Sequence, residues 1–332
     1  GMNRKPANLV SVAPMMDWTD RHCRYMLRLI SQRALLYTEM VTVEAILHGD
    51  RQRLLGFDGS EHPVALQLGG SDPRLLAECA RIGADWGYDE INLNVGCPSN
   101  RVQSGRFGAC LMREPERVAQ CVQSMASVVD LPVTVKSRIG VDNQDEWSSL
   151  SKLARLAHEA GASRHIVHAR KAWLHGLSPK QNREVPPLRY DIVYRLKAEM
   201  PEMTIVANGG IGTLEAIDLH MSHVDGVMLG RAAYQNPFIL AMIDRCYFDS
   251  SVTPRSRRDV GLEMLAYIEK ETANGTPLRA ITRHMFGLFQ GLPGARAWRR
   301  CLSETAHAMP EPINAIRFTL DSMPSEKTAV AA

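Results

Sequence analysis

Over roughly the first 230 residues, short apolar runs alternate with segments in which apolar residues recur every three or four positions. The first pattern is typical of buried β-strands and the second of helices with one buried face. We predict eight strands, over residues 9–13, 35–38, 63–70, 90–95, 132–138, 165–168, 203–208 and 226–230. The helices predicted between them include residues 115–129, 146–160, 191–200 and 214–221.

Strands that alternate with helices through mostly short connections indicate a parallel sheet. Eight of them in so short a stretch favour an α/β fold of the (β/α)8 TIM-barrel type over an open doubly wound sheet. The open sheet is further disfavoured because no G-x-G-x-x-G follows the first strand. We therefore predict that residues 1–248 form a barrel domain.

A linker, Ser-Ser-Val-Thr-Pro, is predicted from about Asp249 onward. Beyond it the sequence shows helical patterns and no strand signal, over residues 262–272, 280–290, 295–306 and 312–322. We predict a small all-helical C-terminal domain over residues 249–332.

Charge distinguishes the two predicted domains, although the whole chain carries only +3. From Ser251 onward there are 11 Lys and Arg against 8 Asp and Glu, whereas the 28 basic and 28 acidic residues before it cancel. A neutral body with a basic C-terminal part permits nucleic-acid binding.

The seven cysteines are scattered and contain no C-x-x-C pair. This usage suits a reducing compartment and argues against a disulfide framework and a zinc site. No apolar run approaches the roughly 18 residues of a membrane span, and no secretion signal is visible. We expect a cytoplasmic protein that binds no membrane, and nothing indicates an obligate protein partner.

The stretch from Glu90 to Ser99 joins a strand to a cysteine. Asn92 and Asn94 alternate with apolar residues and so lie on one face of the strand. The strand then breaks and leaves the thiol of Cys97 just beyond its C-terminal end. In a barrel of parallel strands this is the end at which active sites lie.

Several predicted strands end in a polar residue that an apolar core would not select. Strand parity places these residues on the interior face, because each lies out of phase with its apolar neighbours. Together they would form a polar ring at one end of the barrel: Gln67, Asn94, Lys136, His168 and Asn208.

Two glycine-containing segments indicate a phosphate-bearing ligand. Asn208-Gly209-Gly210-Ile-Gly follows the seventh strand, and Gly230-Arg231 follows the eighth. Glycines in these two places let backbone N–H groups approach a phosphate, and the arginine adds a charged fork. The alternative for either segment alone is that its glycines only form a turn.

We predict no metal site. His165 and His168 are three apart on a strand and face opposite sides, while His220-x-x-His223 has no carboxylate or cysteine close in sequence. No G-x-S-x-G motif is present, and a nucleophilic pair of Cys97 with His168 stays as a weak alternative.

With these residues assembled, the chain resembles the tRNA-dihydrouridine synthases, and within them the bacterial A-type subgroup that acts on uridines 20 and 20a of the tRNA D-loop. The motifs that carry the resemblance are Ala13-Pro-Met-Met-Asp, Gln67-Leu-Gly-Gly, Asn92-Leu-Asn-Val-Gly-Cys-Pro-Ser, Phe107-Gly-Ala-Cys-Leu-Met, Lys136-Ser-Arg-Ile-Gly, His168-Ala-Arg-Lys-Ala-Trp-Leu, Asn208-Gly-Gly-Ile and Gly230-Arg. They span nearly the whole predicted barrel, and the helical tail is a looser match.

The resemblance implies FMN as cofactor, NADPH as its reductant and reduction of uridine in tRNA to 5,6-dihydrouridine. By motif, FMN would contact Pro14, Met15, Met16, Gln67, Lys136, His168, Asn208, Gly209, Gly210, Gly230 and Arg231. Asn94 would lie where flavin, base and tRNA meet.

The implied chemistry fits the residue types. Hydride would pass from flavin N5 to uracil C6, and the resulting enolate needs a proton at C5. A cysteine thiol keeps its proton at neutral pH yet can release it, so Cys97 suits the proton donor. Lys136 would stabilise negative charge on the flavin or on the uracil oxygens. The target base would have to turn out of its stack to react.

Basic residues outside the barrel core are candidate tRNA contacts: Lys180 and Arg183 in the loop after the sixth strand, and Arg296, Arg299 and Arg300 in the tail. The family's subgroup-specific RNA-binding positions fall on Lys180, Arg183, Arg296 and Arg299. The alternative for each is an ordinary solvated surface charge.

Other functional classes remain open on the sequence alone. One is a flavin barrel that acts on a free pyrimidine, as in dihydroorotate dehydrogenases. Another is a non-catalytic RNA-binding barrel without flavin. A barrel acting on a metabolic sugar phosphate is disfavoured by Cys97 and the polar ring.

Overall fold

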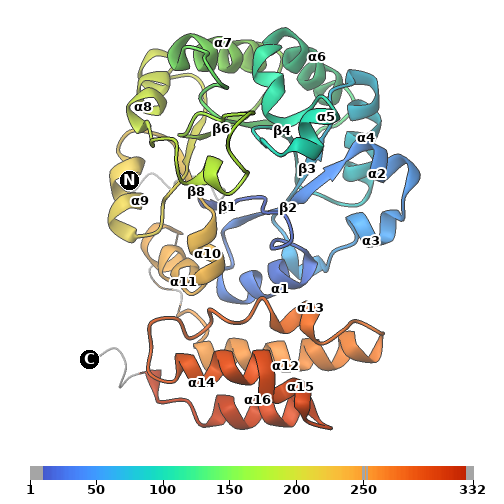
Figure 1. Cartoon of the computed structure of the whole chain (residues 1–332), viewed down its shortest axis with the longest axis vertical. Helices are drawn as coiled ribbons and strands as arrows, with labels where there is room; N and C mark the ends of the chain where they lie inside the picture. Colours follow the sequence, from blue (N-terminus) through green and yellow to red (C-terminus); the bar gives the residue numbers. More distant parts are fainter. Residues whose placement is uncertain (1–9, 249–250, 252, 327–332) are drawn as a thin grey trace. The chain divides into compact units, whose positions relative to one another are not determined.

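The computed structural model describes residues 10–248, 251 and 253–326 (Figure 1). Its contacts group the chain into two compact units. Residues 8–17 and 35–230 form one, here named the barrel unit, and residues 18–34 and 231–332 belong to the other, the helical unit.

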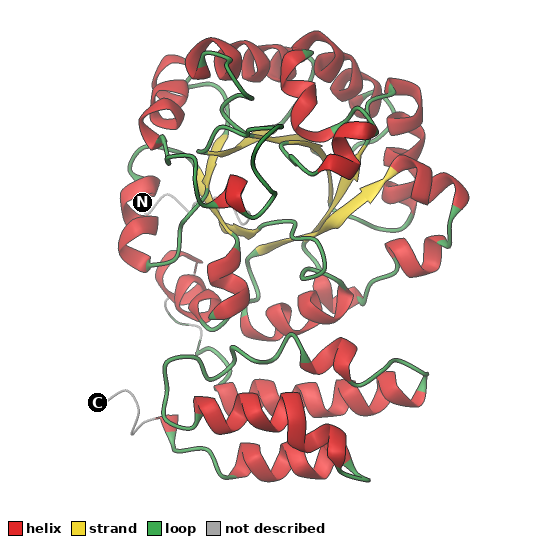
Figure 2. Cartoon of the chain, viewed as in Figure 1, coloured by secondary structure: helices red, strands yellow, loops and turns green. Residues whose placement is uncertain are grey.

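The barrel unit contains eight parallel strands that close on themselves, so the predicted TIM-barrel class is confirmed. Figure 2 shows the strands as a ring with helices outside it. Each strand pairs with the next in sequence, and the first pairs with the last. The strands are β1 (Val10–Val12), β2 (Leu35–Thr42), β3 (Val64–Gly69), β4 (Glu90–Val95), β5 (Val133–Ser137), β6 (Arg164–His168), β7 (Ile205–Asn208) and β8 (Gly226–Leu229).

Helices and short 3-10 turns connect these strands. A typical start is that of α4, where the Asp72 side chain accepts from the backbone N–H groups of Arg74 and Leu75 and Pro73 occupies the first turn. The elements are α2 (Val43–His48), α3 (Arg51–Leu55), η1 (Gly59–Glu61), α4 (Pro73–Asp85), α5 (Asn100–Ser104), η2 (Gly108–Arg113), α6 (Pro115–Ala126), α7 (Glu146–Glu159), η3 (Gln181–Arg183), α8 (Tyr190–Glu199) and α9 (Leu214–Met221).

Alternation along the strands separates two buried layers. Residues facing outward pack against the helices in one large apolar cluster that includes Leu66, Ile91 and Val135. A smaller cluster fills the inside of the barrel: Ala13, Leu35, Tyr37, Ala65, Ile166, Val206 and Met228. Because side chains alternate along a strand, a residue two positions beyond a member of this inner cluster also faces the interior.

The helical unit combines the C-terminal helices with residues from much earlier in the chain. Its elements are α1 (Arg21–Ile30), α10 (Arg231–Gln235), α11 (Ile239–Ile243), a π turn (Asp244–Phe248), α12 (Arg257–Ala273), α13 (Arg279–Thr282), α14 (Ala295–Arg300), a second π turn (Cys301–Thr305), α15 (Ala306–Ala308) and α16 (Pro312–Asp321). The predicted boundary between domains at residue 248/249 stays a prediction, and residues 249, 250 and 252 of the proposed linker lie outside the described part of the chain.

Polar contacts attach α1 to the later helices of this unit. Arg21 pairs with Glu271 at 3.0 Å, and Asp20 accepts from His284 Nε2 at 2.9 Å. At the other end of α1, the Ser31 hydroxyl donates to Asp244 at 2.5 Å. Sequence separation of more than 200 residues hides these contacts from any local pattern.

One predicted helix is wrong. Residues 280–290 carry an apolar helical pattern, yet the helix α13 covers only Arg279–Thr282 and turns follow it. A β-carbon on Gly287 would lie 2.3 Å from the carbonyl oxygen of Gln235. The apolar side chains are nevertheless buried, and Phe289, for example, packs edge-on against Trp298. Among the described residues, none of the helices has the length and apolar character of a membrane span.

Candidate active site

The five residues of the predicted polar ring lie at the C-terminal halves of their strands and on the interior face. His168 and Asn208 are register partners, each two positions beyond a residue of the inner cluster. Asn94 and Lys136 are likewise partners across β4 and β5. Asn94 Nδ2 donates to Gln67 Oε1 at 3.0 Å. These side chains therefore lie near one another at one end of the barrel, as the sequence predicted.

Hydrogen bonds to the backbone of the Cys97 loop hold it in place, from the side chain of Asn94 and from the backbone of Ala109. The side-chain oxygen of Asn94 accepts from the N–H groups of Gly96 at 3.0 Å and Cys97 at 2.9 Å. The Cys97 carbonyl accepts from Ala109 N–H at 2.9 Å. Gly108, at φ +71°, permits this approach, because a β-carbon there would lie 2.7 Å from the Cys97 oxygen. The thiol itself is only half-buried.

Two cations interact electrostatically with this thiol, the half-buried Lys136 and the buried Arg138. Burial, reinforced by the nearby Arg138, lowers the pKa of Lys136 to about 8, while Cys97 acts in the opposite direction. Arg138 is 4% exposed, and burial together with Arg170 lowers its pKa as well. Neither Lys136 nor Arg138 forms an ion pair with any carboxylate in the described part of the chain. Cations that have lost much of their water and have no carboxylate partner are costly, and an anionic ligand would offset that cost.

The end of β7 is shaped for a phosphate. Gly209 and Gly210 have φ of +111° and +68°, and a β-carbon on Gly210 would lie 2.9 Å from Leu188. The buried hydroxyl of Tyr190 lacks a hydrogen-bond partner among the described residues and lies 3.9 Å from that same position. Arg170 acts electrostatically on Tyr190. A phosphate oxygen would satisfy the hydroxyl and meet the glycine backbone.

These observations fit the phosphate of FMN, and they add Tyr190 and Arg170 to the candidate contacts. The sequence contained a signal for Arg170, which stands two residues after His168 in the quoted motif. It contained none for Tyr190, which reaches the site from the start of α8.

The segment after β1 lies beside the end of β8, next but one to β7 around the barrel. Ala13 N–H donates to Leu229 O at 2.8 Å and so ties β1 to β8. Met15 packs against the inner cluster, and a β-carbon on Gly230 would lie 3.9 Å from its sulfur. Pro14 is half-buried and Met16 is 58% exposed. Arg231 begins α10 directly after Gly230.

Asn208 has a use that its motif does not reveal. Its side-chain nitrogen donates to the Met228 carbonyl at 3.0 Å, which joins β7 to β8 at the mouth.

The loop after β6 is held by a buried asparagine that the sequence interpretation missed. Asn182 bonds through its side chain to both backbone groups of Trp173, at 2.7 and 2.9 Å, and its carbonyl accepts from Arg138 at 2.7 Å. Lys180 and Arg183 flank it and are exposed. This loop is therefore fixed to the cationic part of the site.

In the helical unit, α14 presents three exposed arginines around one buried tryptophan. Trp298 donates to Met285 O at 2.8 Å and packs edge-on against Phe289, so Arg296, Arg299 and Arg300 point outward. Arg300 pairs with Glu304 at 3.6 Å. Arg299 also lines a pocket of about 280 Å³ whose wall includes the stacked rings of Trp18 and Tyr234, together with Arg283.

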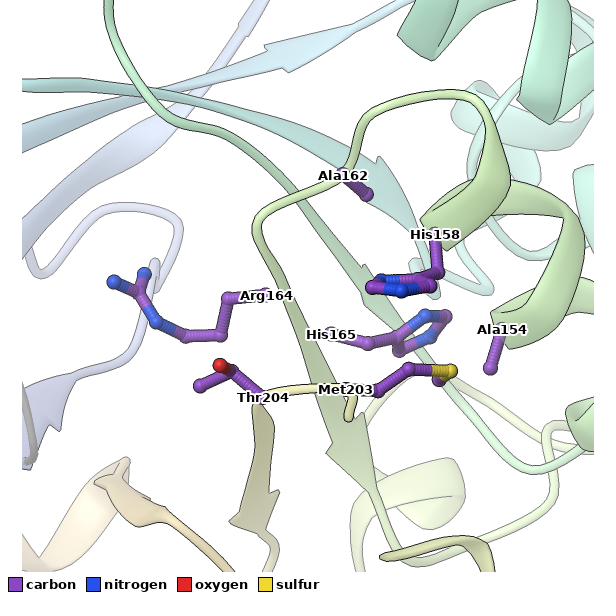
Figure 3. A pocket seen from close by; sticks show the side chains of 7 residues that line it. All are labelled: Ala154, His158, Ala162, Arg164, His165, Met203 and Thr204. Carbon is purple, nitrogen blue, oxygen red and sulfur yellow. The ribbon is translucent and has the colours of Figure 1, made fainter. Parts of the chain in front are cut away.

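His165 faces away from the ligand side. Figure 3 shows it pointing to the opposite side of β6 from Arg164, into a cavity of about 10 Å³ next to His158. Its Nε2 lies 2.8 Å from the Ser137 hydroxyl, and burial lowers its pKa to about 4. Within the described ranges, no cluster of three His, Cys, Asp or Glu side chains is arranged to hold a metal ion.

Comparison with known proteins decides the family. The sequence model of the dihydrouridine synthases matches residues 11–321, which covers both units. The chain belongs to the dihydrouridine synthase family. The resemblance drawn from the motifs is confirmed.

This dihydrouridine synthase is similar to curated relatives named tRNA-dihydrouridine(20/20a) synthase. Identity is 58% over 307 residues to the protein of Synechocystis sp., covering 92% of each chain. It is 54% over 322 residues to that of Vibrio cholerae, covering 97% of this chain and 98% of the relative. The Escherichia coli protein is 58% identical over 311 residues, covering 93% and 90%.

Among solved structures, a 2-naphthoyl-CoA reductase in complex with 2-naphthoyl-CoA matches with a TM-score of 0.55. The match covers 71% of this chain and 50% of the other at 10% identity. This likeness concerns the fold alone.

Proposed function

We propose that this dihydrouridine synthase reduces uridines 20 and 20a of the tRNA D-loop to 5,6-dihydrouridine in the cytoplasm. The names of the relatives support the substrate. The observation that carries the chemistry is a half-buried thiol, Cys97, fixed at a barrel mouth that also holds the uncompensated cations Lys136 and Arg138.

FMN is the proposed cofactor, and NADPH its reductant. When bound, FMN would supply the hydride that uracil receives at C6. Gly209, Gly210 and Tyr190 would hold its phosphate, with Gly230 and Arg231 from the end of β8. Gln67, Lys136, His168 and Asn208 would face the rest of the cofactor, together with Pro14, Met15 and Met16.

Cys97 is proposed to complete the reduction by proton transfer. Once C6 of the uracil has gained hydride, negative charge spreads over C5 and the C4 oxygen. The thiol of Cys97 gives its proton to C5, and the thiolate that remains interacts electrostatically with Lys136. The ammonium group stabilises both the charge on the base and the charge left on sulfur.

The tRNA contacts are proposed on both units. Asn94 lies at the mouth, Lys180 and Arg183 lie on the loop held by Asn182, and Arg296, Arg299 and Arg300 lie on α14. Exposed arginines and lysines at these places suit phosphate oxygens of an RNA backbone. The uridine must turn out of its stack to reach Cys97.

The test is dihydrouridine mapping in tRNA from a bacterial strain that lacks its own enzyme. Wild-type protein should restore dihydrouridine at positions 20 and 20a. With purified proteins and NADPH, Cys97→Ala should form dihydrouridine at least about 100-fold more slowly, since a positioned acid is worth that much. Cys246→Ala, which changes an exposed cysteine of the helical unit, should keep the wild-type rate.

Each arm has a contrary result. Failure of wild-type protein to modify either position would reject the proposed substrate. An unchanged rate in Cys97→Ala would reject the proton donor. Turnover of a free pyrimidine without tRNA would favour the dehydrogenase alternative, and a purified protein without bound flavin would favour a non-catalytic RNA-binding role.

A further inference from the structure

A line of side-chain hydrogen bonds leads inward from the Cys97 loop. Asn94, whose oxygen accepts from Cys97 N–H, donates through its amide nitrogen to Gln67 Oε1 at 3.0 Å. Gln67 Nε2 then donates to Asn92 Oδ1 at 2.9 Å. Gln67 and Asn92 are both buried, at 1% and 0% exposure, so water does not compete for these bonds.

The line continues through the barrel to a buried ion pair. Asn92 Nδ2 donates to the Thr134 hydroxyl at 2.8 Å, and that hydroxyl donates to Glu90 Oε2 at 2.8 Å. The other oxygen of Glu90 accepts from Arg164 Nη1 at 2.6 Å, and Tyr37 also donates to the carboxylate. Arg164 projects from β6 on the side opposite His165 (Figure 3), toward Glu90.

Donor and acceptor roles along this line are not interchangeable. An ionised carboxylate can only accept, so the single hydroxyl proton of Thr134 must point to Glu90. The hydroxyl can then only accept from Asn92, whose amide must present its nitrogen to Thr134 and its oxygen to Gln67. The same logic orients Gln67 and then Asn94.

The final member of the line is the one that matters for chemistry. With this orientation Asn94 turns its oxygen toward the N–H groups of Gly96 and Cys97, which can only donate. A flipped Asn94 would place an amide nitrogen against two donors and lose both bonds.

We propose that Glu90 is a positioning residue for the reaction, acting on the Cys97 loop through Thr134 and the three amides. Its carboxylate orients the inner end of the line, as the N–H groups of Gly96 and Cys97 orient the outer end, and so supports the backbone from which the thiol reaches the base. The inference rests on the proposed function in one respect, the role of Cys97 as proton donor.

The test breaks the line at Thr134 and leaves the ion pair intact. Thr134→Val keeps the shape of the side chain but removes the hydroxyl, whereas Thr134→Ser keeps the hydroxyl. The matched control is Thr282→Val, at a threonine of the helical unit that is equally buried, at 1% exposure. Steady-state kinetics give kcat and KM for tRNA. A second assay measures the rate at which iodoacetamide alkylates Cys97, followed by peptide mass spectrometry with exposed Cys246 as reference.

We expect Thr134→Val to lower kcat about tenfold, because the two buried hydrogen bonds of the hydroxyl, from Asn92 and to Glu90, are lost. KM for tRNA should change little, because the surfaces that bind tRNA are left as they are. Alkylation of Cys97 should become about threefold faster relative to Cys246, as the loop opens more often. Thr134→Ser should restore most of the rate, and Thr282→Val should match wild type in both measurements.

Three results would overturn the proposal: unchanged kcat and alkylation in Thr134→Val, a loss in kcat without any change at Cys97, or an equal loss in Thr134→Ser. Circular dichroism checks folding, and Thr134→Cys, whose thiol bonds only weakly, replaces Thr134→Val if that variant does not fold. Alkylation needs no tRNA. A wild-type protein that fails to reduce tRNA would therefore reject the proposed function, while Cys97 reactivity would still test the line.

Discussion

A β-carbon on Gly209 would lie 2.8 Å from Cδ2 of His168, across the junction of β6 and β7. Only glycine fits here, because the residue also has φ of +111°. We expect Gly209→Ala to displace the imidazole and weaken FMN binding by about tenfold or more. Flavin affinity measured by fluorescence titration checks this.

The control for that substitution is Gly161→Ala, at the end of α7. Its φ of +115° imposes the same backbone strain, but a β-carbon there meets Ala126 at an ordinary 3.4 Å. Gly161→Ala should bind flavin as wild type does. If both variants lost flavin equally, backbone strain rather than the close approach to His168 would be responsible.

Lys136 should make the stability of the flavin-free protein depend on pH. Burial lowers its pKa from an unfolded value near 10.5 to about 8. Between those values the unfolded chain binds more protons than the folded chain, so the free energy of unfolding rises with pH. Below pH 8 the variant Lys136→Met should be more stable than wild type, by on the order of 1 to 3 kcal/mol.

Urea unfolding from pH 7 to 10 measures this difference, which should shrink as the pH rises through the window. Lys152→Met removes an exposed lysine and should leave the pH profile of wild type unchanged. A constant difference between Lys136→Met and wild type across the whole range would contradict a lowered pKa of Lys136 in the folded protein.

The buried pair of Glu90 and Arg164 should be costly to break. Both side chains are under 10% exposed, and the carboxylate also accepts from Thr134 and Tyr37. Arg164→Met would leave a buried carboxylate without its cation, and we expect a loss of about 3 to 5 kcal/mol in the free energy of unfolding.

The comparison is the surface pair of Arg195 and Glu199, which is half exposed at 3.1 Å. Arg195→Ala should cost less than about 1 kcal/mol by the same denaturant measurement. If the two variants lost similar amounts of unfolding free energy, the pair of Glu90 and Arg164 would be no more sensitive to loss of its cation than a surface pair. That result would contradict the expected cost of leaving Glu90 buried without its partner.

The arginines of α14 should contribute to RNA affinity through charge. Arg296→Ala/Arg299→Ala should weaken tRNA binding and reduce the slope of log affinity against log salt by about 2, because each arginine neutralises about one phosphate. Binding titrations at several salt concentrations measure this, and bound flavin should be retained.

Arg317→Ala removes one exposed arginine of α16, in the same unit, and serves as the control for loss of a surface charge elsewhere. It should leave the salt slope as it is. If the double variant instead lost flavin, or if Arg317→Ala had the same effect on the slope, the assignment of α14 to RNA binding would be wrong.

Much of the fold could be predicted because it follows from local periodicity. Alternation within β4 and β5 is enough to place Asn94 and Lys136 on one face, and parallel strands bring their C-terminal ends together. The glycines after β7 could be recognised because positive φ is a local requirement. The family motifs then connected these positions to one chemistry.

Other features depended on residues that are distant in sequence. The contact of α1 with α12 and the interruption of the predicted helix at residues 280–290 depend on partners far away in the sequence. A short stretch of sequence read by itself does not reveal them. The same holds for Asn182 below Arg138, and for Tyr190 beside Gly210.

The barrel, its polar mouth and the position of Cys97 could all be derived from the order of residues along the chain, because strand alternation and turn residues act over a few neighbours. The direction in which each amide of that mouth points became clear only in the folded chain. Hydrogen-bond direction is fixed by partners on other strands, and here it runs from Cys97 through Asn94 to the charge on Glu90.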